Sequence, residues 1–181
     1  IPRGMSLGAT MTLPERDVLN RNRSELLDQL VVLCGGRIAE KLFTGDISTG
    51  ARMDIHMASQ IARKMVCDYG MSDKLGFQSL GGSQEPLFLA REMTKSQDHS
   101  EETSRMIDAE VAGLISAAYA RCEALIAANR DKLELLVTTL LEKETMDGRD
   151  VEELLTLGRI RTEEERLAER RQNEPVPVET A

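Results

Sequence analysis

Asp54 combines a residue type and a position that could do chemistry. It lies in the stretch STGARMDIHMASQIARKMV, residues 48–66, whose pattern predicts a helix that begins close to Asp54. A carboxylate in the first helical turn can serve only to complement the positive end of the helix dipole, an interaction of about 0.3–1 kcal/mol. The same carboxylate could instead bind a metal ion. The residues alone leave both interpretations open and favour the first.

The two histidines do not complete a metal site with Asp54. His56 follows Asp54 by two positions, and such side chains point about 200° apart on a helix. His99 lies in the cap region of a different predicted helix. Two histidines without an H-E-x-x-H motif cannot supply the three protein ligands of a usual catalytic zinc site. The chain also lacks a G-x-S-x-G elbow and a phosphate-binding G-x-x-x-x-G-K-[ST] loop, so its residues alone indicate no enzyme.

A glycine pair offers a second choice of interpretations. Gly35-Gly36-Arg37, followed by Ala39 and Glu40, could form an anion site. The pair lies inside an amphipathic run and does not follow a strand, which favours a packing role at a close helix crossing or a kink.

Composition excludes several classes of partner. The 181 residues carry a net charge of -8 and have a pI near 4.9, which argues against nucleic acid as the main partner and against an anionic membrane surface. Aromatic residues make up only 3%, so stacking platforms for bases are not expected. Three cysteines lie far apart without a C-x-x-C pair, which predicts buried, reduced thiols and no cysteine metal cluster. They are Cys34, Cys67 and Cys122.

The patterning predicts a mainly α fold, a helical bundle with a short edge β-strand near the N-terminus. Residues 5–13, closed by Pro14, form the expected strand. Helices are expected from about residue 24, with Ser24 as the first N-cap, to about residue 157. We expect one domain over residues 1–160 and a charged tail over 161–181, which would be a frayed helix followed by disorder. The first predicted helix has an apolar stripe made of Leu26, Leu27, Leu30, Val31, Cys34, Ile38 and Leu42.

Taken in order, four blocks of the chain resemble the peptidase domain of the FtsH family, which are ATP-dependent, membrane-anchored zinc metalloproteases. The resemblance covers residues 1 to about 155, and the order and spacing of the blocks make it specific. One departure is Met53, where the family usually has Asn before the ligand Asp. The blocks read IPRGMSLGATMTLPERD, then LLDQLVVLCGGRIAEKLFTGDISTGARMDIHMASQIARKMVCDYGMSDKLGF, then FLAREMTKSQDHSEETSRMIDAEV, then LLEKETMDGRDVEELL.

The resemblance implies a role for Asp54 as the third zinc ligand. In that family the other two ligands are the histidines of an H-E-x-x-H helix, whose Glu is the general base. That helix is expected just upstream of Ile1, so this chain would be a fragment that holds no catalytic residue and is inactive by itself. The predicted strand would be the cleft-side edge strand, on which a peptide substrate binds by strand addition. Its proposed substrate-binding residues are Leu7, Gly8, Ala9, Thr10 and Met11.

The resemblance also implies the setting of the parent protein. It would be a homo-hexameric zinc endopeptidase that degrades membrane and unfolded proteins, with ATP and Mg²⁺ bound in a separate motor domain. The expected location is the bacterial inner membrane, with this domain soluble on the cytoplasmic side; an organelle membrane is the alternative. A different class of function also stays open, namely a non-catalytic pseudo-protease in which this bundle is an oligomerisation scaffold.

Overall fold

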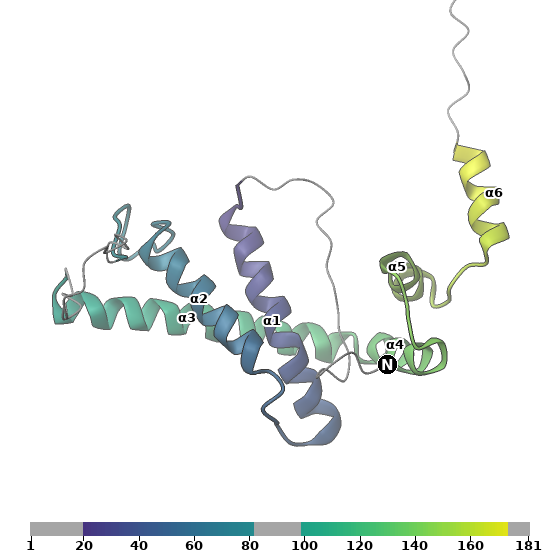
Figure 1. Ribbon diagram of the computed structural model, residues 1–181, viewed down its shortest axis with the longest axis horizontal. Coiled ribbons are helices and arrows are strands. Elements are labelled where there is room, and N and C mark those ends of the chain that lie inside the picture. Colours follow the sequence, from purple (N-terminus) through teal and green to yellow (C-terminus); the bar gives the residue numbers. More distant parts are fainter. Residues whose placement is uncertain (1–19, 82–98, 174–181) are drawn as a thin grey trace, which may run out of the picture. The chain divides into compact units, whose positions relative to one another are not determined.

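The computed structural model describes residues 20–81 and 99–173, and within these it contains six helices and no strand (Figure 1). The predicted mainly α fold is therefore confirmed. The predicted edge strand at 5–13 lies outside the described residues and stays a prediction. The helices are α1 (Arg23–Thr44), α2 (Arg52–Cys67), α3 (Glu101–Ala128), α4 (Arg130–Lys143), α5 (Gly148–Leu157) and α6 (Glu163–Asn173).

The helices belong to two compact units. Helices α1, α2 and α3 lie within Pro14–Ala128, and α4, α5 and α6 lie within Asn129–Ala181. In the first unit, α1 packs against both α2 and α3, and α2 also packs against α3.

The core of the first unit is apolar and arises from residues spaced three and four apart on each helix. Leu30 of α1 and Ala62 and Met65 of α2 have no exposed surface. Leu42, expected in the α1 stripe, is instead exposed, because it lies in the last turn beyond the helices that cover the stripe. The buried members of the main cluster are Leu26, Leu30, Val31, Cys34, Ile38, Ala58, Ala62, Met65, Ala118 and Cys122.

The three cysteines are buried and free, as the sequence predicts. Burial raises the pKa of each thiol above its ordinary value, since a thiolate loses hydration inside the core. Cys34 and Cys122 join the main cluster, whereas Cys67 belongs to a smaller one with Val66, Leu75 and Ile107. These thiols act as small apolar side chains and have the properties of neither reactive nor metal-binding cysteines.

Helix α1 begins earlier than the sequence indicates. Its N-cap is Asn22 and not Ser24, and Asn22 forms a capping box with Glu25, whose Oε2 accepts a hydrogen bond from the Asn22 N–H at 3.0 Å. The helix ends at Gly45, which has φ +76° and donates its N–H to the Lys41 carbonyl. A left-handed residue at this position is the usual way to end a helix, and it turns the chain back toward α2.

The connection after α2 is fastened to α3 by a buried polar contact. Ser72 is buried and donates its hydroxyl to Glu110 Oε2 at 2.8 Å, and Lys74 Nζ lies 2.7 Å from Glu110 Oε1. These two partners hold the pKa of Glu110 below its ordinary value, with Lys74 the larger cause. Leu75, in the same turn, is buried in the smaller apolar cluster.

The second unit has few apolar contacts. No residue of α4, which is described throughout, is buried, and the buried residues of α5 are Leu154 and Glu153. Helix α5 begins at Asp147, whose carboxylate accepts the Asp150 N–H at 2.7 Å. Helix α6 lies inside the segment expected to be a frayed, charged tail, and its contacts with α5 are ionic. The residues after Asn173 lie outside the described part of the chain.

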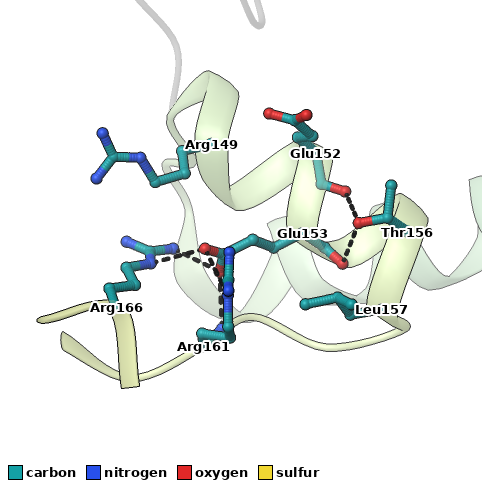
Figure 2. A pocket seen from close by; sticks show the side chains of 7 residues that line it. All are labelled: Arg149, Glu152, Glu153, Thr156, Leu157, Arg161 and Arg166. Carbon is teal, nitrogen blue, oxygen red and sulfur yellow. Dashed lines mark hydrogen bonds and ion pairs between the residues drawn. The ribbon is translucent and has the colours of Figure 1, made fainter. Parts of the chain in front are cut away.

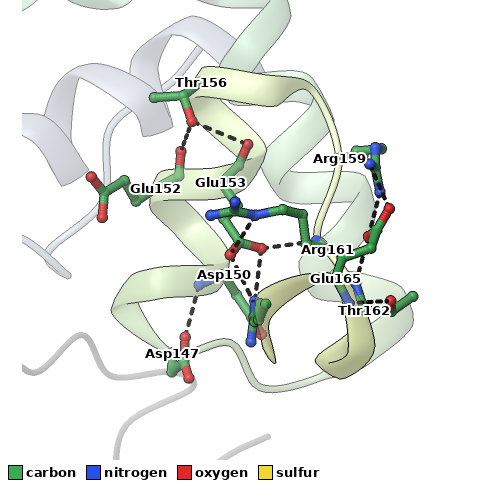
Figure 3. A network of polar contacts seen from close by, with 10 residues as sticks. Asp147, Asp150, Glu152, Glu153, Thr156, Arg159, Arg161, Thr162 and Glu165 are labelled. Atoms are coloured by element: carbon green, nitrogen blue, oxygen red, sulfur yellow. Dashed lines mark hydrogen bonds and ion pairs between the residues drawn. The ribbon is translucent and has the colours of Figure 1, made fainter. Parts of the chain in front are cut away.

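The contacts between α5 and α6 centre on Glu153 (Figure 3). Its carboxylate accepts hydrogen bonds from Arg166 Nε at 2.9 Å and from the Arg161 backbone N–H at 2.8 Å. Arg166 also reaches Asp150 Oδ1 at 2.6 Å. The bond from Arg166 is the main reason why the pKa of Glu153 falls to about 2. We refer to Asp150, Glu153, Arg161 and Arg166 as the Glu153 cluster.

A second, more exposed pair strengthens the start of α6. Arg159 donates two hydrogen bonds to Glu165, each 2.8 Å long, and Glu165 Oε2 accepts the Thr162 N–H at 2.9 Å. Thr162 Oγ1 in turn accepts the Glu165 N–H, which completes a capping box. The pKa of Glu165 falls to about 2, mainly through the bonds from Arg159.

In the described part of the chain, α3 is long and apolar enough to cross a membrane by length and composition alone, with a mean hydropathy of 1.4 over its best window. Helices α1 and α2 both pack on α3, and 11% of that window is buried.

Candidate metal centre

Asp54 lies in the first turn of α2, as the sequence predicts. The preceding residue Ala51 is the N-cap; its side chain is buried and gives the helix start no side-chain hydrogen bond. Asp54 itself is half-buried. Its carboxylate is therefore near the positive end of the helix dipole, where an anion is favoured.

A short turn leads into α2 and is closed by local hydrogen bonds. Gly50 N–H donates to Ser48 Oγ at 3.1 Å, and Arg52 N–H donates to the Thr49 carbonyl at 3.1 Å. The first helical bond follows at once, from Ile55 N–H to the Ala51 carbonyl at 3.0 Å. The backbone from Ser48 to Asp54 is thus a continuous run of hydrogen-bonded turns.

Two charged residues of α1 hold the beginning of this turn. Arg37 Nη1 donates to the Ser48 carbonyl at 2.7 Å, and Glu40 Oε2 accepts the Ser48 N–H at 3.1 Å. Hydrogen bonding by the Ser48 side chain and N–H, with a smaller effect of Arg37, lowers the pKa of Glu40. We call Arg37, Glu40 and Ser48 the Ser48 clamp.

The glycine pair of α1 lies beside this site but does not mark a close backbone crossing. A Cβ placed on Gly35 would have no described atom within 4 Å. A Cβ placed on Gly36 would meet a single described atom at that limit, Asp54 Oδ2 at 4.0 Å. An added methyl at Gly36 would only make ordinary van der Waals contact with the carboxylate of Asp54, so this carboxylate lies beside Gly36 without requiring a glycine there. The neighbouring Arg37 is engaged with Ser48.

Asp54 is a single candidate metal ligand, and no further ligands gather around it among the described residues. Its carboxylate makes no hydrogen bond or ion pair to any residue that the structure describes, although it is half-buried. No group of three or more His, Cys, Asp or Glu side chains gathers anywhere in that part of the chain. His56 is exposed and lies 3.0 Å from the Gln60 side chain, so it is not brought to Asp54. One carboxylate of a zinc site fits here.

The predicted substrate-binding residues Leu7, Gly8, Ala9, Thr10 and Met11 lie outside the described residues. Their role stays a prediction.

A separate group of charged side chains lines a cavity of about 430 Å³ between α5 and α6 (Figure 2). Arg161 and Arg166 point toward Glu153, while Arg149 extends away from it. Arg161 and Arg166 form ion pairs with Glu153, and Arg166 also pairs with Asp150. The lining contains no cysteine, serine or histidine. The ion pairs of Arg166 join the two helices.

Sequence reasoning missed the Ser48 clamp. It identified Arg37 and Glu40 as residues beside a glycine pair, and the signal that could have found the clamp is their spacing. Arg37 and Glu40 are three residues apart, so they lie on one face of the helix. The helix ends a few residues later in a turn. Their partner is a backbone group, which no sequence motif displays.

Comparison with known proteins places the chain in a family. The model of peptidase family M41 matches residues 1–154. A protein from Akkermansia muciniphila named ATP-dependent zinc metalloprotease FtsH is 46% identical over 162 residues, which is 89% of this chain and 20% of that relative. FtsH 1 from a Thermoanaerobacter species is 46% identical over 85% of this chain and 25% of its own length.

A third relative, the FtsH protein of Acidobacterium capsulatum, is 47% identical over 83% of this chain and 24% of its own length. The chain thus spans about a fifth to a quarter of the length of these relatives. The matched region contains the first three blocks and all but the last residue of the fourth, together with Asp54 and the Ser48 clamp. The chain belongs to peptidase family M41.

Proposed function

We propose that this chain is the C-terminal peptidase-domain part of an ATP-dependent zinc metalloendopeptidase, with Asp54 as the third zinc ligand. The observation that carries the proposal is the carboxylate of Asp54, which is half-buried at the start of α2, lies over Gly36 and has no partner among the described residues. A carboxylate that only complements a helix dipole does not need to be half-buried. The names of the relatives support both zinc and ATP dependence.

Each part of the chain has a defined task in this proposal. Zinc held by Asp54 and by the two histidines of an H-E-x-x-H motif would supply an activated water for hydrolysis of a peptide bond. Asp54 contributes one anionic oxygen, and residues 7–11 bind the substrate backbone as an added strand. The other two zinc ligands are histidines of an H-E-x-x-H motif, whose Glu is the general base. This sequence lacks that motif. The 181-residue chain alone is therefore inactive and binds zinc weakly at best.

The rest of the proposed machinery comes from outside this chain. ATP and Mg²⁺ act in a motor domain of the longer protein, and the substrates are membrane and unfolded proteins. The assembly is a homo-hexamer at a bacterial inner membrane, with this domain in the cytoplasm. These points rest on the family and on the relatives' greater length.

The test compares two first-turn aspartates in the intact protein. Asp54→Ala and Asp131→Ala each remove a carboxylate from the first turn of a helix, so any loss of helix-dipole stabilisation is matched. We expect Asp54→Ala to lose bound zinc and proteolysis of an unfolded substrate but to keep ATP hydrolysis, and Asp131→Ala to keep all three. Retention of zinc by Asp54→Ala would show that Asp54 is a helix-start carboxylate. A wild-type protein without zinc or proteolysis would instead support the scaffold function.

A further inference from the structure

We propose that Arg37 and Glu40 are positioning residues for the metal ligand Asp54, acting through Ser48. This inference rests on the proposed function. It states that the affinity of the site for zinc depends on two hydrogen bonds from α1 to the turn that precedes α2.

The Ser48 clamp is not needed to satisfy the hydrogen bonding of buried backbone groups. Every residue from Lys41 to Gly50 is exposed, so water could satisfy the backbone of Ser48. Yet both polar backbone groups of Ser48 are taken by charged side chains, from residues eight and eleven positions earlier. Ordering two long side chains costs conformational entropy, which a purely solvated turn would not require. The clamp therefore restricts where the turn lies.

Hydrogen bonds connect Ser48 to the first turn of α2, where Asp54 lies. Ser48 Oγ accepts the Gly50 N–H, Thr49 carbonyl accepts the Arg52 N–H, and α2 begins there. Helix α2 has no side-chain N-cap that would hold its first turn locally. We therefore expect a shift of Ser48 to pass through these bonds to the first turn, where Asp54 Oδ2 lies beside Gly36.

Metal coordination tolerates only small changes in the distance between ligand and metal. Metal–ligand distances are held within about 0.2 Å of their preferred values. Residues that orient ligands without touching the metal commonly change metal affinity by about 10–100-fold when they are removed. If the turn were free to move by an ångström, the zinc affinity that Asp54 contributes would fall by a similar factor.

The experiment measures zinc affinity in the intact protein by competition with a chelator, and records the visible spectrum of the Co²⁺-substituted protein. We expect Glu40→Ala and Arg37→Gln each to weaken zinc binding by about 10–100-fold and to change the Co²⁺ spectrum. Glu40→Gln keeps an oxygen that can accept the Ser48 N–H, so it should restore most of the affinity. Lys41→Ala is the matched control, because Lys41 lies on the same helix and pairs with Glu123 instead of Ser48.

The outcomes separate this inference from the proposed function. If Asp54→Ala abolishes zinc binding while Glu40→Ala and Arg37→Gln bind like Lys41→Ala, the clamp has no positioning role and the inference is wrong. An equal loss in Glu40→Gln and Glu40→Ala would also overturn it, because the hydrogen bond would not be what matters. If Asp54→Ala itself binds zinc normally, the proposed function fails. Should Glu40→Ala not fold, Arg37→Gln tests the other half of the clamp independently.

Discussion

The two units of the chain are held together in different ways. In the α1–α3 unit, apolar side chains from three helices meet in a core, and Leu30 and Met65 have no exposed surface. In the α4–α6 unit, the most buried side chains include a carboxylate, Glu153, which is 3% exposed and surrounded by arginines. The first unit is stabilised by removing apolar surface from water, and the second by charge-assisted hydrogen bonds.

This difference has a consequence for how each unit responds to change. Hydrophobic burial depends little on pH, whereas ionic contacts require that carboxylates stay ionised. The candidate metal ligand Asp54 is in the unit with the apolar core, so its support should survive conditions that release α6.

The largest effect is expected from a cavity in the apolar core. Leu30→Ala should destabilise the α1–α3 unit by about 2–5 kcal/mol, because it removes a fully buried side chain and leaves a void. Val32→Ala, two residues away on the same helix, changes a side chain that is 73% exposed and should cost less than about 0.5 kcal/mol. Hydrogen exchange of the α1–α3 amides in the 181-residue chain measures both. Equal effects of the two variants would mean that α1 does not bury this face.

A second, more local effect is expected at the Glu153 cluster. Glu153→Gln removes the charge on which Arg161 and Arg166 converge, and should release α6 while leaving α1–α3 unchanged. With 11 residues, α6 is too short to be a stable isolated helix, so release should appear as loss of helical backbone chemical shifts at 163–168. Glu152→Gln is the control, since Glu152 is the next residue along the chain and is exposed. If both variants keep α6 helical, the ionic contacts do not hold it.

The same contacts set a pH dependence with a definite sign. Because the pKa of Glu153 is lowered from 4.5 to about 2, its stabilising contribution is complete above pH 4.5 and is lost as the pH falls toward 2. Glu165 behaves in the same way. In a titration followed by NMR, α6 should lose its helical shifts over this range. If α1, α2 and α3 lost their helical shifts together with α6, the two units would share one transition.

The smallest effect is expected at two glycines of α1. Gly35→Ala should stabilise the α1–α3 unit of the 181-residue chain by about 1 kcal/mol, since Gly35 is inside the helix and an added methyl meets no described atom within 4 Å. Gly45→Ala should destabilise it by about 1 kcal/mol, because Gly45 has φ +76°. Chemical denaturation followed by circular dichroism compares them. Changes of the same sign in both variants would contradict the geometry at one of the two positions.

What the sequence could predict follows the same division. Apolar spacing identified Leu26, Leu30, Cys34 and Ile38 correctly, because burial of one helix face is a periodic property. It failed at Leu42, since the pattern does not show where neighbouring helices stop covering α1. It also chose Ser24 over Asn22, two residues with similar capping preference, and the nearby Glu25 decides in favour of Asn22.

The candidate site was predictable in part. The position of Asp54 in the first turn of α2 followed from local sequence, and its assignment to zinc came from the resemblance to a family. The Ser48 clamp and the Glu153 cluster were not predicted. Both depend on charged side chains that meet backbone groups or one another across a turn, and charged residues on a helix are far more often simply solvated.

The central claim is that the carboxylate of Asp54 binds zinc. The most direct measurement is X-ray absorption at the zinc edge on the intact protein and on its Asp54→Cys variant. If Asp54 is a ligand, the wild-type protein shows only nitrogen and oxygen neighbours at about 2.0–2.2 Å, and the variant gains a sulfur neighbour at about 2.3 Å. A variant that holds zinc with an unchanged nitrogen and oxygen shell would contradict the claim.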